Sequence, residues 1–174
     1  MFSAKDGRTV LLRKPRWDDL DGLLALINSL VREDAPINRM AEVSRLEESE
    51  FLTKRLSSIE NGAIIQVVAE VDGEIVGNAE ISKLRGREAH VGRLGIGVKR
   101  DYRRIGIATR MIESLLHQAE EHGLKIILLA VYANNLSAIT LYRKFGFREI
   151  GRTPKGVRWK DAYVDDIRMV LEIA

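Results

Sequence analysis

Two adjacent arginines, followed by a glycine, stand where a strand-forming run gives way to a helical pattern, in the stretch KRDYRRIGIATRM at residues 99–111. The first backbone N–H groups of a helix have no partner within the helix, and the helix dipole adds partial positive charge, so this position favours an anion. Gly106 allows close approach of the backbone to a bulky ligand, and Arg103 and Arg104 supply permanent charge for phosphate oxygens. The stretch therefore indicates a phosphate site. A tight turn relaxed by glycine beside solvated arginines is an equal alternative for so short a motif.

Two standard phosphate-binding motifs are absent from the sequence. It contains no G-x-x-x-x-G-K-[ST] loop, and the G-x-G formed by Gly95 and Gly97 lies inside a strand pattern without the third glycine of a dinucleotide fingerprint. The pattern therefore disfavours a nucleoside triphosphate and NAD as ligands. Together with Gly92, these glycines indicate instead that something lies close against the backbone of that strand.

A second group of residues follows further along the chain, in VYANNLSAITLYRKFGF at residues 131–147. The two stretches, in this order, resemble the GNAT superfamily of N-acetyltransferases. Residues 103–108 resemble its [Q/R]-x-x-G-x-[G/A] motif, whose backbone amides bind the pyrophosphate of acetyl-CoA, and the second stretch resembles its V-x-x-x-N-x-x-A-x-x-L-Y-x-x-x-G-F signature. The residues that match this signature are Val131, Asn135, Ala138, Leu141, Tyr142, Gly146 and Phe147.

The resemblance covers nearly the whole chain and implies an acyltransferase that moves the acetyl group of acetyl-CoA to a primary amine by direct attack. Within the superfamily, HVGRLGIGV and YVDDIRM are most similar to bacterial and archaeal enzymes that acetylate small amines, amino acids or protein amino termini. A small molecule or an amino acid is therefore the expected acceptor. A protein amino terminus or lysine is the alternative acceptor, and a degenerate CoA-binding regulatory protein is the non-enzymatic alternative.

The resemblance also implies roles for individual residues. A backbone N–H near Val98 would polarise the acetyl oxygen as in an oxyanion hole, and Asn135 would hydrogen-bond the cofactor arm. Tyr142 would give a proton to the departing thiolate, although an aromatic residue on a helix more often packs in the core. The implied cofactor-binding residues are Ile96, Gly97, Val98, Arg103, Arg104, Ile105, Gly106, Ile107, Ala108, Thr109 and Asn135.

The resemblance does not identify the base that takes a proton from the amine. Many relatives carry Asp or Glu at this position of the fourth strand, but this sequence has Arg93. Glu80 and His90 are the nearest candidates for this catalytic role, and His90 has a suitable intrinsic pKa of about 6.5. A lone histidine at a strand end is often only a surface residue, however. Alternate strand positions such as that of Glu80 often face solvent.

The elements that would position these groups follow from the spacing of apolar residues and from turn signals. Strand patterns cover 9–14, 63–84 with a hairpin turn at Asp72 and Gly73, 91–98, 125–133, 147–152 and 162–173, and helical patterns follow Pro15 and precede Gly62, Gly123 and Gly146. With the resemblance, they predict a single α/β (α+β) domain over residues 1–174. It would hold a mixed, mostly antiparallel sheet of about seven strands and about four helices, with the fourth and fifth strands splayed apart.

Composition restricts the partners. The 174 residues carry a formal net charge of +3, with the charges interspersed, so neither nucleic acid nor a membrane is expected. Cysteine is absent and the three histidines have no metal-ligand spacing, so no metal is expected. The first residues lack the apolar run of a signal peptide, which favours a cytoplasmic protein, and the resemblance allows a homodimer.

Overall fold

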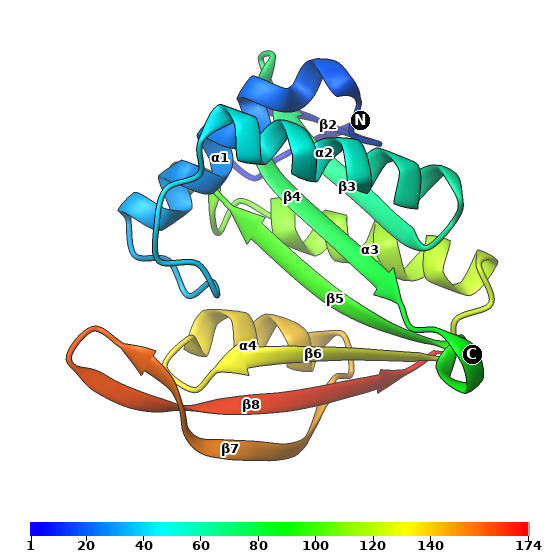
Figure 1. Cartoon of the computed structure of the whole chain (residues 1–174), viewed down its shortest axis with the longest axis vertical. Helices are drawn as coiled ribbons and strands as arrows, with labels where there is room; N and C mark the ends of the chain where they lie inside the picture. The colour runs from blue at the N-terminus through cyan, green and yellow to red at the C-terminus, as the bar shows by residue number, and fades with distance from the viewer. Residues whose placement is uncertain (174) are drawn as a thin grey trace.

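The structure is a computed structural model that describes residues 1–173, in which an open sheet of eight strands is flanked by four α-helices (Figure 1). This confirms the predicted α/β fold with a mostly antiparallel sheet, and the very short β1 accounts for the additional strand. The elements are β1 (Phe2–Ser3), β2 (Thr9–Arg13), α1 (Leu20–Arg32), α2 (Arg45–Glu60), β3 (Ile64–Val71), β4 (Glu74–Lys83), β5 (Val91–Val98), α3 (Ile107–Glu121), β6 (Ile126–Tyr132), α4 (Leu136–Lys144), β7 (Arg148–Trp159) and β8 (Ala162–Glu172).

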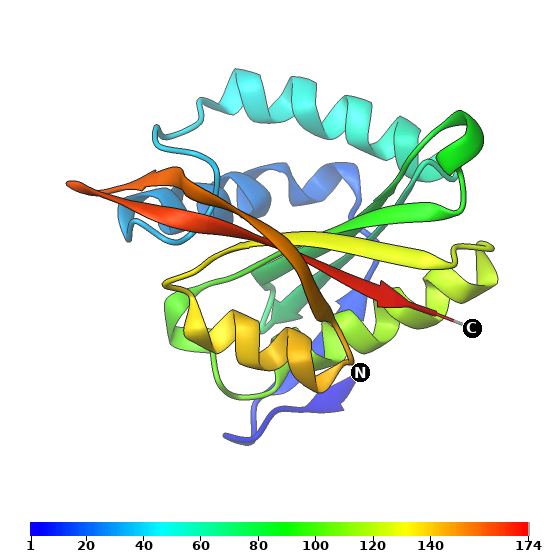
Figure 2. The same cartoon turned by 90° about the horizontal axis from the view of Figure 1, so that it is seen from below.

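The strand order is β1-β2-β3-β4-β5-β6-β8-β7, and every neighbouring pair is antiparallel except β5 and β6. This parallel pair is possible because α3 connects β5 to β6 as a crossover. Helices α1 and α2 cover one face of the sheet and α3 and α4 the other (Figure 2), so an apolar cluster forms on each side. Within residues 1–173, none of the helices combines the length and the apolar character needed to cross a membrane.

Strand β7 is longer than the predicted strand at 147–152 and continues to Trp159. Pro154 and Gly156 give this segment the composition of a loop. The structure accommodates them because β7 is the outer strand of the sheet, where a missing N–H breaks no ladder, and because its register with β8 shifts between Thr153 and Val157.

Strands β5 and β6 pair over only three positions, from Val91 with Ile126 to Arg93 with Leu128. Beyond these pairs β5 continues along β4 and β6 continues along β8, so the two strands diverge toward the carboxyl end of β5 (Figure 1). The predicted splay of the fourth and fifth strands is therefore present. These strands are β5 and β6 here, because the prediction did not include the very short β1.

The separation leaves backbone groups of β5 without a strand partner. Residues of an antiparallel pair alternate in the side toward which their N–H and C=O groups point. The N–H of Lys99 bonds to the carbonyl of Val76 on the β4 side at 2.8 Å. By this alternation the backbone groups of Ile96 and Val98 point into the gap between β5 and β6.

Two of the three glycines of β5 are explained by protein packing and not by a ligand. A Cβ at Gly92 would lie 2.4 Å from Cγ2 of Ile81, and a Cβ at Gly97 would lie 2.8 Å from Cδ1 of Leu30. The sequence-based expectation that something lies close against the backbone of this strand is met at these two positions by protein side chains. At Gly95 the nearest atom would be a side-chain carbon of Glu80 at 3.8 Å, an ordinary contact distance, so this position has free space above it.

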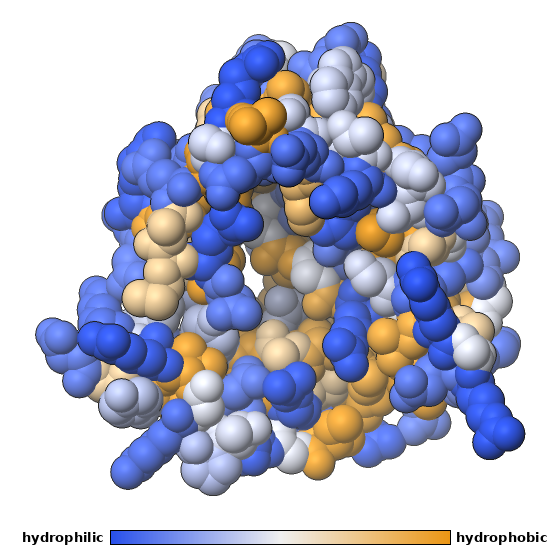
Figure 3. Space-filling model, viewed as in Figure 1, coloured by the Kyte–Doolittle hydropathy of each residue, from blue (hydrophilic) through white to orange (hydrophobic). Residues whose placement is uncertain are grey.

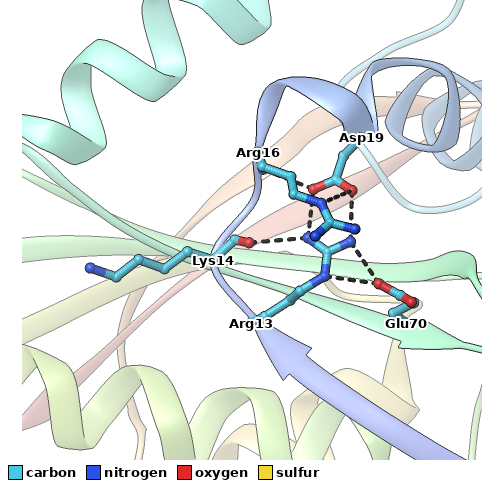
Figure 4. A network of polar contacts seen from close by, with 5 residues as sticks. All are labelled: Arg13, Lys14, Arg16, Asp19 and Glu70. Carbon is cyan, nitrogen blue, oxygen red and sulfur yellow. Dashed lines mark hydrogen bonds and ion pairs between the residues drawn. The ribbon is translucent and has the colours of Figure 1, made fainter.

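A network of charged side chains joins the beginning of α1 to the sheet (Figure 4). The guanidinium of Arg13 donates to both carboxylate oxygens of Asp19 at 2.7 Å and to Glu70 at 2.8 Å. Asp19 also accepts from the backbone N–H of Arg16 at 2.8 Å. Burial by itself would raise the pKa of Asp19, but the hydrogen bonds from Arg13 and Arg16 outweigh it and hold this pKa below its usual value.

Replacing Arg13 by methionine should lower the free energy of unfolding by roughly 2–4 kcal/mol, because it leaves the buried carboxylate of Asp19 without its partner. Urea denaturation at about pH 7 measures this loss. Because the pKa of Asp19 is lowered in the folded state, the stabilisation is complete above the unfolded pKa of 3.8 and is lost as the pH falls through the folded value.

The exposed pair of Arg32 with Glu42 provides the control, since Arg32→Met should have a much smaller effect. A difference between wild type and Arg13→Met that stays constant down to about pH 2 would contradict the assigned role of the network.

Candidate active site

The amino-terminal end of α3 presents a run of unpaired backbone donors. Gly106 is the N-cap residue with φ of 97°, and no side chain caps the helix. Arg103 N–H donates to the carbonyl of Arg100, and Arg110 N–H donates to the carbonyl of Gly106. Between them, the six N–H groups of residues 104–109 have no acceptor in the part of the chain that the structure describes. Such a run, together with the helix dipole, is suited to an anionic ligand.

The two arginines before this helix have different surroundings. The guanidinium of Arg103 donates through Nε to the carbonyl of Val98 at 2.8 Å and through Nη2 to the carboxylate of Glu33 at the end of α1. It therefore has protein partners, and it ties α1 to the loop before α3. Arg104 is exposed, adopts φ of 64° and makes no ion pair within the described residues, so its charge remains available to a ligand.

A cavity of about 530 Å³, here called the loop cavity, adjoins these donors. Ile105, Gly106 and Thr109 line it, so the structure brings three of the sequence-predicted residues together on one wall. Lys5 from the amino-terminal segment and Lys144 from α4 also line it and add positive charge. The loop cavity can therefore hold an extended anionic group against the donors of α3.

Asn135 is the N-cap residue of α4. Its side-chain oxygen accepts the N–H of Ala138 at 3.3 Å and the hydroxyl of Ser137 at 3.2 Å. The side-chain carbonyl is therefore used by the helix itself, and only the amide N–H groups of Asn135 are open to a ligand.

Tyr142 lies on α4 and is buried, with 8% of its surface exposed and its ring packed edge-to-face on Phe147. The ring therefore belongs to the core. Its hydroxyl has no hydrogen-bond partner among residues 1–173, yet it is not among the fully enclosed polar atoms, so it remains accessible. Burial raises the pKa of Tyr142 to about 12, which keeps the hydroxyl protonated at neutral pH.

A second cavity of about 300 Å³, here called the inner cavity, lies between α1, α2 and strands β3 to β5. The surface in this view is hollowed near its middle, with hydrophobic atoms inside and a hydrophilic rim (Figure 3). Ile96 and Gly97 line the inner cavity, so it reaches the strand whose backbone faces the gap. Its other walls combine leucine and isoleucine side chains of α1 and α2 with polar and charged side chains from α2 and the sheet.

Glu80 lies in the inner cavity and forms an ion pair with Arg55 of α2 at 2.8 Å. Burial raises the pKa of Glu80, and the charge and hydrogen bond of Arg55 offset only part of this effect. The alternative in which Glu80 faces solvent is therefore wrong: it faces α2. The structure brings Glu80 to the same strand level as Gly95, its partner across β4 and β5.

His90 lies at the other end of β5. It is exposed, and its carbonyl accepts the N–H groups of Lys125 and Ile126 where β5 and β6 are still paired. Six residues of strand separate it from Ile96, which is roughly 20 Å at about 3.3 Å per residue. The structure does not bring His90 into either cavity, and the alternative of a surface residue describes its position.

Sequence analysis missed three polar residues that line the inner cavity: Glu48, Gln66 and Asn78. Glu48 precedes Leu52 by four positions, on the same face of α2, so an acid on the apolar side of a helix was the available signal. Gln66 interrupts an apolar strand in the same way. Both are buried, with 7% and 3% of their surfaces exposed.

Comparisons with known proteins agree with this geometry. The family described as Acetyltransferase (GNAT) family matches residues 26–147. The chain is 28% identical over 159 residues to an N-alpha-acetyltransferase of Sulfurisphaera tokodaii, covering 84% of this chain and 85% of that protein. It is also 28% identical over 149 residues to an L-methionine sulfoximine/L-methionine sulfone acetyltransferase of Pseudomonas aeruginosa, covering 82% of this chain and 85% of that protein.

Solved structures share the fold. An acetyltransferase of the GNAT family from Streptococcus pneumoniae has a TM-score of 0.84 and 26% identity, covering 95% of this chain and all of that one. A phosphinothricin acetyltransferase from Sinorhizobium meliloti in complex with acetyl-CoA has a TM-score of 0.83 and 21% identity, covering 95% of this chain and 89% of that one. Because the family match spans more than half of the chain and the fold agrees over nearly all of it, the chain belongs to the GNAT family of acetyltransferases.

Proposed function

We propose that this protein transfers the acetyl group of acetyl-CoA to the primary amine of a small molecule or an amino acid by direct attack. The observation that carries the proposal is the run of six unpaired N–H groups at residues 104–109, beside the gap between β5 and β6. Acetyl-CoA would supply an activated acetyl thioester. The structure of the Sinorhizobium meliloti relative with acetyl-CoA supports this choice of ligand for the fold.

Residues on both sides of the gap fit the parts of acetyl-CoA. The N–H groups of residues 104–109, with Gly106 at their centre, would hold the diphosphate, and the charge of Arg104 would add to them. The N–H and C=O of Ile96, which point into the gap, would pair with the amide groups of the cofactor arm, whereas the carbonyl of Val98 already accepts from Arg103. The free amide N–H groups of Asn135 would provide a further donor. Arg103 would act indirectly, by holding the loop in place.

The chemistry requires a group that stabilises the departing sulfur and a group that accepts the proton of the amine. Tyr142 holds its proton at the hydroxyl, and because its pKa is about 12, hydrogen-bond donation to a thiolate is favoured over complete proton transfer. Glu80 remains a candidate for the base, but its ion pair with Arg55 already uses its charge. The backbone N–H of Val98 would polarise the acetyl oxygen.

A protein amino terminus is the second candidate for the acceptor, and the N-alpha-acetyltransferase of Sulfurisphaera tokodaii supports it. A thiol-release assay that compares small amines, amino acids and peptides separates the two. We also propose one catalytic domain over residues 1–174. A cytoplasmic location and a homodimer stay predictions from the sequence.

Replacing Gly106 by alanine should weaken acetyl-CoA binding about tenfold in calorimetry. No atom of the protein lies within 4 Å of a Cβ at this position, so the added methyl group would occupy the space from which a ligand reaches the backbone. The positive φ adds a strain of about 1–2 kcal/mol.

Gly123→Ala at the end of α3 is the matched control, because it has φ of 73° and equally open surroundings. Both variants should lose similar stability, whereas only Gly106→Ala should lose affinity. Absence of saturable acetyl-CoA binding by the wild-type protein would contradict the proposed function itself.

Replacing Tyr142 by phenylalanine should lower kcat roughly 10- to 100-fold, because it removes the hydroxyl that interacts with the sulfur while the packed ring is kept. The affinity for acetyl-CoA should stay within about twofold. Thiol release under saturating substrate measures the change, and Tyr163→Phe at an exposed position is the control. An unchanged kcat would remove the role assigned to this hydroxyl.

A further inference from the structure

The inner cavity contains a buried carboxylate that has no partner in the protein. Glu48 lies on the side of α2 that faces the sheet, and 7% of its surface is exposed. No hydrogen bond or ion pair engages its side chain within residues 1–173, whereas the neighbouring Glu47 is held in the capping box of Ser44. A buried charge without a partner is unfavourable, so it calls for a complementary ligand.

A second unpaired acceptor belongs to Gln66, a residue that also lines this cavity. The amide nitrogen of Gln66 donates to the side-chain oxygen of Asn78 at 2.7 Å, which fixes the orientation of the Gln66 side chain. Its own oxygen, Oε1, is then fully buried and receives no hydrogen bond, and it is the only side-chain atom of this kind in residues 1–173. Gln66 Oε1 is therefore closed to a ligand in the cavity, whereas the carboxylate oxygens of Glu48 are unpaired and not fully enclosed within residues 1–173.

The arginine side chains near this cavity do not form an ion pair with Glu48. Arg55 is paired with Glu80 at 2.8 Å and also stands over the ring of Phe51 at 4.6 Å. Arg39 is exposed at the rim and makes no ion pair with Glu48. The remaining walls are aliphatic, from residues such as Leu23, Leu26, Ile27, Leu30 and Leu52. The missing complement is therefore a cation with several N–H donors and an apolar body.

We propose that the inner cavity binds an alkylammonium ion, with Glu48 neutralising its charge and the aliphatic walls contacting its carbon chain. That this ion is the acceptor substrate rests on the proposed function. The substrate class is then a small primary amine with an apolar body, because about 300 Å³ is at the lower end of the volumes of ligand sites. Ile96 and Gly97 in the wall connect the cavity to the gap that would hold the thioester.

The test is a titration of the full-length protein, with and without CoA, using 3-methylbutylamine as the cationic probe and 3-methyl-1-butanol as an uncharged molecule of the same shape. Wild type should bind the amine, and Glu48→Gln should weaken this binding by about tenfold or more. Glu50→Gln, an exposed position on the same helix, should leave it within about twofold. The affinity for the alcohol should not depend on Glu48.

The proposal is overturned if wild type does not bind the amine, or if Glu48→Gln leaves its affinity unchanged or weakens the amine and the alcohol equally. Measuring the acetylation of amines separates this inference from the proposed function. Acetylation of amines that is unaffected by Glu48→Gln contradicts this inference alone, whereas Glu48-dependent binding without acetyl transfer contradicts the proposed function alone.

Thermal unfolding distinguishes a binding role from a structural one. Burial raises the pKa of Glu48, and the charges of Arg39 and Arg55 offset part of this effect, with Glu47 and Glu80 as the other acids near the cavity. An acid with a raised folded pKa destabilises the protein as the pH rises above its unfolded value of 4.5. Without ligand, Glu48→Gln should therefore melt at the same or a higher temperature than wild type at neutral pH. A lower melting temperature would indicate a structural role and would contradict the proposal.

Discussion

A β-sheet ordinarily leaves unpaired backbone groups only on its outermost strands, yet β5 and β6 separate in the interior of this one. Each strand is held on its other side, β5 by seven residue pairs with β4 and β6 by seven with β8, so the sheet remains intact while the gap stays open. Buried N–H and C=O groups need partners. The groups of β5 that face the gap and have no protein partner, such as those of Ile96, are the ones that the proposed ligand would engage.

The same separation determines how the helices approach the site. The carbonyl of Val98, which points into the gap, is satisfied by Arg103, and the same guanidinium reaches Glu33 at the end of α1. One side chain therefore joins the end of β5, the loop before α3 and the helix that forms a wall of the inner cavity. Packing of Leu30 against the backbone at Gly97 reinforces this connection. The loop before α3 and the helix that lines the inner cavity are thus connected through one side chain.

Local patterns predicted the fold well, because strands, helices and the loop before α3 each follow from residues close in sequence. The alternation and turn signals led to the correct hairpin at Asp72 and Gly73, and Gly106 was correctly expected at the beginning of α3. The partners of Arg103 and the ion pair of Glu80 could not be predicted in this way. Glu33 lies 70 positions before Arg103, and such a contact exists only after the fold has formed.

The inner cavity was not predicted for the same physical reason. An acid such as Glu48 on the apolar face of a helix is ambiguous, because sequence periodicity states which face is buried but not whether the buried space is filled. The glycines of β5 have the same ambiguity. They predicted a close neighbour but not which one, and at Gly92 and Gly97 it is a protein side chain, whereas Gly95 has free space above it.

The division of the two cavities along the chain has an evolutionary consequence. The inner cavity takes its walls from residues 23–80 and from the glycine-rich end of β5, whereas the loop cavity is built mainly from residues 105–145. Substitutions of the residues of α1 and α2 that line the inner cavity would thus reshape the proposed amine pocket without replacing a residue of the turn before α3. Related proteins could therefore differ in the amine that they acetylate while they use the same acetyl donor.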